Sequence, residues 1–184
     1  GRDQWDYNEE SRQVIPNTEF EADGVRYEVK EYETKVETTV REYLDRGGRT
    51  GFVKGSDTHE GKPAARTAVL ARELTREAIF EALRSRRTYG ISHGRILLDF
   101  KINGCSMGED IEIEGKPRIS VDVRGTARIE EVLIIRDGSP IQTLHPESDR
   151  VRFEHADDSF PGRSYYYIRV TQTDTDEHGN PSRA

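Results

Sequence analysis

The chain contains 184 residues (21.1 kDa), of which 33% are hydrophobic and 34% are charged, and its formal net charge is −7. This composition supports a core of modest size within one or two domains and argues against a wholly disordered chain. Nucleic-acid binding needs clustered Lys and Arg, so an acidic chain predicts no nucleic-acid partner. No apolar run approaches the roughly 20 residues that cross a bilayer, so we expect no membrane partner either.

The single cysteine, Cys105, excludes an internal disulfide bond and a cysteine-based zinc site. The chain begins with Gly1, and its first ten residues are polar and acidic rather than signal-like. We therefore interpret the chain as a piece of a longer protein. These features do not fix the compartment, and a soluble protein of the cytoplasm is the interpretation that we favour.

The first ninety residues carry mixed patterns that are typical of an α/β region. An Asp-Gly pair favours a hairpin over 20–29, although a surface loop has the same composition. Apolar residues at helical spacing, followed by two glycines, predict a helix over 34–46. A short strand is expected from Thr50, running into a polar loop. The clearest helix covers 75–86, with Thr75 as its cap.

From Arg95 onward, apolar and polar residues alternate and turn signals recur, which predicts an all-β region. The expected strands are 95–102, 110–114, 118–124, 128–136, 140–144, 150–155 and 164–173. About seven short strands indicate an immunoglobulin-like sandwich. The alternation points Ile119, Val121 and Val123 inward on one strand, and Tyr166, Ile168 and Val170 inward on the last.

Asp57 and His59 form an Asp-x-His pair directly after the strand expected from Thr50. In an extended chain, residues two apart point to the same side. The carboxyl ends of strands are where α/β folds hold their ligands, and zinc, manganese and iron accept both donor types. The same spacing recurs in the polar tail at Asp176 and His178, where we expect no organised structure. Both a metal site and a hydrogen-bonded loop pair therefore stay open at this point.

The order of these segments resembles the end of a PHP (polymerase and histidinol phosphatase) domain. The resemblance rests on residues 55–61 (GSDTHEG), 67–70 (TAVL), 73–84 (ELTREAIFEALR) and 86–89 (RRTY). The tail segments 128–132, 135–138 and 164–170 resemble the β-sandwich that follows the barrel in the branch of carbamate-ester and phosphoester hydrolases. The resemblance implies that residues 1–92 are the carboxyl-terminal portion of a distorted (β/α) barrel and residues 93–184 a β-sandwich domain with a polar tail.

The resemblance also implies the chemistry. Asp57 and His59 match the last metal-binding motif of the family, as ligands of divalent zinc, manganese or iron and as catalytic residues. The implied reaction is hydrolysis of a small-molecule phosphoester or related ester by metal-activated water. Asp57 is implied as a ligand or as the group that takes a proton from that water. His59 is implied as a ligand or as the donor to the leaving group.

The chain departs from the family pattern at its beginning. PHP enzymes open with a His-x-His motif and add ligands from several strands, whereas this chain has no His-x-His. Its histidines are His59, His93, His145, His155 and His178. Because a catalytic metal takes about three protein ligands, metal binding is expected only together with the missing amino-terminal part of the barrel. This piece alone is expected to be inactive.

A non-catalytic function is the alternative hypothesis. In it, an immunoglobulin-like module serves for interdomain packing or protein binding, and the Asp-x-His pair is incidental. A barrel remnant would also expose apolar surface within 34–86, which favours association with another chain. Metal dependence at Asp57 and His59 discriminates between the two hypotheses.

Four other features have structural interpretations that we favour. Cys105 is expected to be a thiol in a turn, and His93 a hinge or helix-capping residue. The basic run at 84–87 is expected to form a solvated helix end. Alternation places Tyr165 and Tyr167 on the face opposite the core, where they pack structurally.

Overall fold

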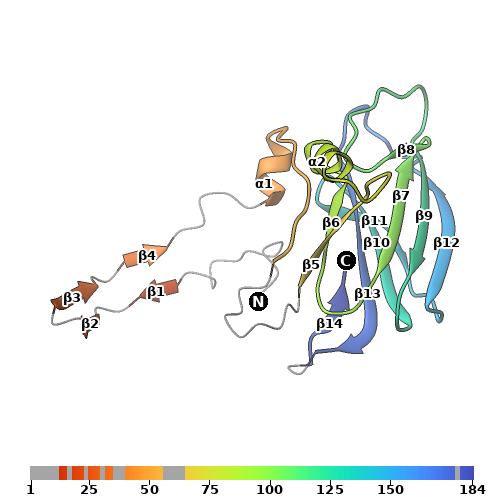
Figure 1. Cartoon of the computed structure of the whole chain (residues 1–184). Coiled ribbons are helices and arrows are strands. Elements are labelled where there is room, and N and C mark those ends of the chain that lie inside the picture. Colours follow the sequence, from red (N-terminus) through yellow and green to blue (C-terminus); the bar gives the residue numbers. More distant parts are fainter. Residues whose placement is uncertain are drawn as a thin grey trace. The chain divides into compact units, whose positions relative to one another are not determined.

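Strands make up most of the regular structure in this computed structural model (Figure 1). The structure describes residues 13–15, 18–22, 25–29, 32–34, 40–55, 65–176 and 179–184. The chain divides into two compact units, residues 1–49 and residues 50–184. Within the described ranges, no helix is both long enough and apolar enough to cross a membrane.

Two four-stranded antiparallel sheets form most of the second unit (Figure 1). The first has the strand order β11 (Ser139–Leu144), β10 (Ile129–Arg136), β13 (Tyr166–Thr175), β14 (Pro181–Arg183). The second has the order β12 (Arg150–Ala156), β9 (Arg118–Arg124), β7 (Leu97–Ile102), β8 (Cys105–Ser106). These antiparallel sheets are consistent with a β-sandwich, which confirms the expected all-β region.

A single apolar cluster contains side chains from both sheets. On β9, Ile119, Val121 and Val123 are at most 1% exposed, as the alternation predicted. The buried side chains from the other strands of this cluster include Leu98, Phe100, Val132, Ile134 and Val170. Burying each such side chain contributes about 1.5–3 kcal/mol, so this cluster supplies most of the hydrophobic stabilisation of the unit.

A helix-containing hairpin precedes the two sheets in the chain. β5 (Arg66–Val69) pairs with β6 (Thr88–Ile91) in antiparallel register, and α2 (Arg76–Arg84) lies between them in sequence. The side chain of Thr75 accepts a hydrogen bond from the Ala78 N–H at 3.3 Å, which confirms the predicted helix cap.

Tyr89 fastens this hairpin to β7. Its ring belongs to the main apolar cluster. Its hydroxyl donates to the Ile96 carbonyl and accepts from the Leu98 N–H, each at 3.1 Å. Burial raises the pKa of Tyr89 above its ordinary value, against a smaller lowering by the Leu98 N–H, so the hydroxyl keeps its proton. These contacts bridge the domain boundary expected between residues 92 and 93, which stays a prediction.

The described part of the first unit contains short strand pairs and the helix α1. β2 (Thr18–Ala22) and β3 (Val25–Val29) form the hairpin predicted over 20–29, and β1 (Gln13–Ile15) pairs with β4 (Tyr32–Thr34). α1 (Val40–Asp45) ends before Gly47, whose φ of 84° is the conformation predicted for a helix end. The helix predicted over 34–46 begins too early, because Thr34 pairs with Gln13 in a strand.

The strand predicted over 110–114 is wrong. Its alternating sequence finds no strand partner, because the chain after β8 runs toward the carboxyl end of α2. There Arg86 donates to Asp110 at 3.0 Å. A Cβ at Gly108, which has a φ of 91°, would lie 2.2 Å from the Ser85 carbonyl oxygen. Close backbone packing and an ion pair therefore hold this segment in place of a sheet.

Two further expectations needed correction. The strand expected from Thr50 is absent, since residues 50–55 have no regular pairing. The polar tail, where no organised structure was expected, contains β14, which pairs with β13 and carries the buried Ser182. The sequence predicted neither β6 nor β14, because each is short and lacks a clear alternation.

Replacing Tyr89 tests the attachment of the hairpin. Tyr89→Phe removes both hydrogen bonds of a buried hydroxyl, so we expect the free energy of unfolding to fall by about 1–3 kcal/mol in guanidinium titrations. Tyr43→Phe, at a more exposed ring, is the control and should change it little. Equal stability of wild type and Tyr89→Phe would contradict this attachment.

Candidate functional site

Asp57 and His59, predicted as catalytic residues and metal ligands, lie in residues 56–64, outside the described residues. The structure describes both flanks of this segment. Thr67 on β5 uses one hydroxyl for two hydrogen bonds of 3.0 Å, accepting from the Lys54 N–H and donating to the Lys54 carbonyl. Lys54 precedes the Asp57–His59 segment and Thr67 follows it, so the two flanks of this segment are in direct contact.

The flank before the segment packs on β6. A Cβ at Gly51 would lie 2.8 Å from the Thr88 hydroxyl, and a Cβ at Gly90 would lie 2.9 Å from the Lys54 Cβ. Gly90 thus leaves room for the Lys54 side chain at the point where Thr67 holds its backbone. Packing and hydrogen bonds together fix the start of the segment to the β5–β6 hairpin.

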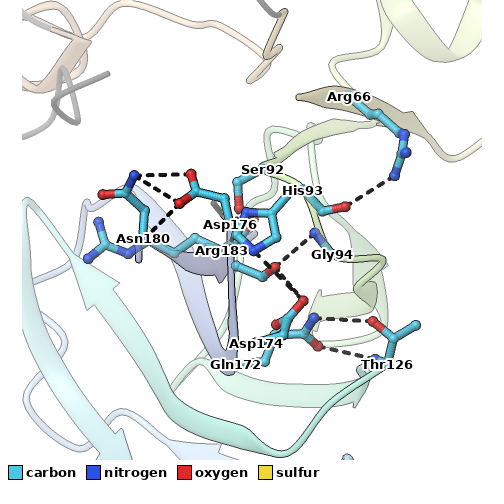
Figure 2. A network of polar contacts seen from close by, with 11 residues as sticks. Arg66, Ser92, His93, Gly94, Thr126, Gln172, Asp174, Asp176, Asn180 and Arg183 are labelled. Atoms are coloured by element: carbon cyan, nitrogen blue, oxygen red, sulfur yellow. Dashed lines mark hydrogen bonds and ion pairs between the residues drawn. The ribbon is translucent and has the colours of Figure 1, made fainter. Parts of the chain in front are cut away.

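A second polar cluster joins β13, β14 and the connection between β6 and β7 (Figure 2). The hydroxyl of Ser182, which is fully buried, accepts from the Gly94 N–H and donates to Asp174 Oδ2, each at 2.8 Å. The ring Nε2 of His93 lies 3.8 Å from the same Asp174 oxygen. These four residues combine a hydroxyl, a carboxylate and an imidazole in one place.

Their arrangement is that of a structural fastening rather than of a catalytic triad. Ser182 donates its proton to Asp174 and not to His93, so the imidazole does not activate the hydroxyl. Among the described residues, His93 Nε2 and Asp174 Oδ1 have no hydrogen-bond partner, and the two side chains are 19% and 31% exposed. The backbone of Arg183 also pairs with Ser92 through bonds of 2.7 and 3.0 Å. The cluster holds the final strand against the β6–β7 connection.

A buried amide extends this cluster. Gln172 is fully buried, its Oε1 accepts from the Thr126 N–H at 3.1 Å and its Nε2 donates to the Thr126 hydroxyl at 3.3 Å (Figure 2). A Cβ at Gly94 or Gly125 would lie 2.3 Å from the side-chain amide of Gln172. Glycine at both positions therefore gives the amide its space.

A third cluster surrounds Asp157, whose exposed fraction is 2%. Arg136 Nη1 donates to both carboxylate oxygens, at 2.8 and 2.6 Å. The Tyr166 hydroxyl donates to Oδ2 at 2.8 Å, and Ser159 donates its N–H and its hydroxyl to Oδ1 at 3.1 and 3.0 Å. Every side of the carboxylate is occupied, which leaves it no position for a ligand.

The cluster shifts the titration of its members. Burial raises the pKa of Asp157, but the hydrogen bonds from Tyr166, Arg136 and Ser159 outweigh it and hold that pKa below its ordinary value. Burial, followed by the bond to Asp157, raises the pKa of Tyr166. Asp157 is therefore a charged, structural group at neutral pH and not a general base.

On the outer face of the second sheet, three arginines surround one aspartate, Asp122. Arg152 forms two hydrogen bonds to Asp122 across the β9–β12 pair, and Arg150 and Arg124 lie 3.6 and 3.8 Å from the same carboxylate. Burial raises the pKa of Asp122, but Arg152 and then the other two arginines lower it below its ordinary value. The three guanidinium groups are partly exposed to water, and ion pairs on such a solvated surface contribute little to the stability of the fold.

The other residues singled out in the sequence have structural surroundings. Cys105 lies half-buried in β8 as a free thiol. Tyr165 and Tyr167 stack on each other, with ring centroids 6.3 Å apart, in the structural role expected for them. The basic helix end is solvated only in part, because Arg84 is exposed, whereas Arg86 and Arg87 are half-buried and pair with Asp110 and Glu81. Within the described residues, no three His, Cys, Asp or Glu side chains gather closely enough to hold a metal ion.

Sequence reasoning missed the Asp157 and Ser182 clusters for one reason. Their members come from distant parts of the chain, since Gly94 and Ser182 are separated by 88 positions in the sequence and Arg136 and Asp157 by 21. No local motif marks such a set. The one available signal was the pair of polar residues Gln172 and Asp174 within the last long strand.

Comparison with known proteins places this chain in a family. The model of a family described as "Protein of unknown function (DUF3604)" matches residues 18–113, which is more than half of the chain. The chain belongs to the DUF3604 family. The match covers both flanks of the Asp57–His59 segment, α2 and the hairpin, and it ends before β9.

Curated relatives extend well beyond the matched region. The chain is 33% identical to an uncharacterized protein of Chlamydia pneumoniae over 167 aligned positions, covering 74% of this chain and 27% of that protein. It is 30% identical over the same shares to an uncharacterized protein of Chlamydia trachomatis. This DUF3604 chain thus spans about a quarter of the length of these relatives. No solved structure matched it.

Replacing Asp157 tests the role of its cluster in this DUF3604 chain. Asp157→Asn removes one partner of a buried ion pair, so the free energy of unfolding at pH 7 should fall by about 3–5 kcal/mol. Because the folded-state pKa is lowered, the stabilisation is present above the unfolded pKa of about 3.9 and is lost as pH falls through the lower folded pKa.

The control is Asp158→Asn, at the neighbouring carboxylate, whose side chain is exposed and pairs with Lys116. Denaturant unfolding is measured at pH 7 and at pH 3. The free energy of unfolding should fall less between these two pH values for Asp157→Asn than for wild type. A wild-type pH dependence that Asp157→Asn leaves unaltered would contradict this assignment.

Proposed function

We propose that this chain is part of a PHP-type metal-dependent hydrolase and that Asp57 and His59 are its ligands to a divalent metal. The observation that carries the proposal is the double hydrogen bond of Thr67 to the two backbone groups of Lys54. A motif on a segment of this length gives reproducible metal geometry only if its ends are fixed, and this bond fixes them.

The donor set fits a transition metal. A carboxylate and an imidazole are ligands that zinc, manganese and iron share. Two ligands leave a metal site incomplete, since catalytic sites take about three protein ligands and keep a position for water. Because the relatives are nearly four times as long as the region they share with this chain, we propose that the other ligands come from outside it.

Asp57 and His59 would each either bind the metal or transfer a proton. Asp57 would hold a metal or accept the proton of the attacking water, and His59 would hold a metal or donate to the leaving oxygen. A bound divalent ion supplies a lowered pKa of its water and compensation of charge on the leaving oxygen. The substrate class that fits this chemistry is a small phosphoester or related ester.

The proposal also concerns the two parts of the fold. Residues 1–92 would be the end of the barrel, and residues 93–184 an immunoglobulin-like β-sandwich attached to it. The fastening of β6 to β7 by the Tyr89 hydroxyl supports a fixed geometry between the hairpin and the sandwich. A sandwich held in this way would support the segment that carries Asp57 and His59.

Metal analysis tests the proposal. The natural gene product and the 184-residue chain are purified as wild type and as the double variant Asp57→Asn, His59→Ala, and their metal content is measured by plasma mass spectrometry. We expect the natural product to carry a transition metal that the double variant loses. Ester screening of the metal-loaded protein would follow.

The matched control makes the same two replacements outside the motif, Asp149→Asn with His145→Ala, and its metal content should equal that of wild type. If no form binds more metal than the Asp57–His59 variant, the hydrolase proposal fails. The non-catalytic interaction module would then be the better account.

A further inference from the structure

Two arginines lie directly opposite each other on the outer face of the second sheet. Arg124 on β9 pairs in register with Arg150 on β12, and the next pair on the same face joins Asp122 to Arg152. Like charges in directly opposite positions destabilise a strand pair. Three guanidinium groups thus share one carboxylate, which leaves two positive charges without a negative charge among these four residues. We name Arg124, Arg150 and Arg152 the arginine cluster.

Asp122 occupies few of the donors of this cluster. Arg152 donates to Asp122 Oδ2 from Nε, at 2.9 Å, and from Nη2. Arg150 Nη2 and Arg124 Nε lie 3.6 and 3.8 Å from the carboxylate, which is beyond hydrogen-bond distance. Each guanidinium group has five N–H donors. Within the described residues, those of Arg124 and Arg150 make no hydrogen bond, so they are available to a ligand.

The cluster is open to water around a less exposed centre. The side chains of Arg150, Arg124 and Arg152 are 51%, 55% and 71% exposed, whereas that of Asp122 is 16% exposed. Exposed ion pairs contribute little to the stability of a fold. Stability therefore gives no reason to place three arginines around one carboxylate, at the cost of a like-charge pair across two strands.

The neighbouring carboxylates do not neutralise the excess charge. Asp99 on β7 lies beside the cluster, but its Oδ2 accepts from Lys101 Nζ at 2.6 Å. Asp149 Oδ1 accepts from the Ser148 hydroxyl at 3.5 Å. Glu154 lies opposite a serine of β9, at the end of the cluster away from its like-charge pair. The excess of two positive charges is thus concentrated at the end formed by β9 residue 124 and β12 residue 150.

The charge and the donor geometry together fit a phosphate group. A phosphate monoester carries a charge of about −1.5 to −2 at neutral pH and three strong acceptor oxygens, whereas a carboxylate carries a single charge. The planar fork of a guanidinium group binds phosphate oxygens through two parallel hydrogen bonds. A phosphate dianion would therefore match both the excess charge and the free donors of the cluster.

We propose that Arg124, Arg150 and Arg152, oriented by Asp122, form a binding site for the dianionic phosphate group of a small molecule. The site lies wholly on β9 and β12 of the sandwich (Figure 1). It requires no metal ion and no residue of the Asp57–His59 segment. The proposal therefore stands independently of the hydrolase function.

Calorimetric titration with inorganic phosphate tests the site. The 184-residue chain is titrated at pH 8 and low salt in the Asp57→Asn, His59→Ala background, so that binding at the proposed metal site does not contribute. We expect saturable binding that Arg150→Gln weakens at least about tenfold, because hydrogen bonds to charged groups are lost. Arg118→Gln is the matched control, since it removes one exposed arginine from the same face of β9, and it should change the affinity less than about twofold.

Three outcomes would overturn the proposal. The first is the absence of saturable phosphate binding. The second is an equal loss of affinity in Arg118→Gln and Arg150→Gln, which would show attraction to positive charge in general. The third is acetate binding as tightly as phosphate at the same ionic strength, whereas we expect sulfate to compete with phosphate and acetate to bind at least about tenfold more weakly. Arg124→Gln gives a second, independent variant, and it should weaken binding as Arg150→Gln does.

Discussion

The apolar layer between the two four-stranded sheets is the interaction on which the rest of this chain depends. With only a third of its residues apolar, the chain concentrates its buried apolar side chains on β7, β9, β10 and β13. They alternate along β7 and β9, whereas β10 buries four consecutive residues, 132–135. Outside the two sheets, the β5–β6 hairpin adds Tyr89 and Ile91 to the same cluster, whereas α2 buries only Ala82. Polar side chains at the margins of the layer add hydrogen bonds to this packing.

Three hydroxyl groups show how this attachment works. Tyr89 joins β6 to β7, Ser182 joins the last strand to the β6–β7 connection, and Thr67 joins the two flanks of the Asp57–His59 segment. Each hydroxyl both donates and accepts, so each satisfies two groups at once. The third of these contacts ties together the two flanks of residues 56–64.

The sequence predicted those features of the fold that depend on residues close together in the chain. The cap at Thr75, the helix end at Gly47 and the inward row of β9 follow from residue types within one turn or one strand. The error at 110–114 had another origin, since alternation there competes with the pairing of Arg86 and Asp110. The same limit hid the Ser182 and Asp157 clusters, because tertiary contacts between distant residues leave no pattern in the sequence. Asp57 and His59 were predicted from sequence because they lie two residues apart, and this prediction concerns residues outside those that the structure describes.

Our central proposal is that the Thr67 hydroxyl, by holding Lys54, supports metal binding by Asp57 and His59. The most direct test is the metal affinity of the natural gene product carrying Thr67→Val or Thr67→Ser, measured by competition with a chelating dye. Valine removes both hydrogen bonds at nearly constant shape, whereas serine keeps the hydroxyl. The account predicts weakened binding, by about tenfold or more, for Thr67→Val and near wild-type binding for Thr67→Ser. Equal affinity of both variants and wild type would contradict it.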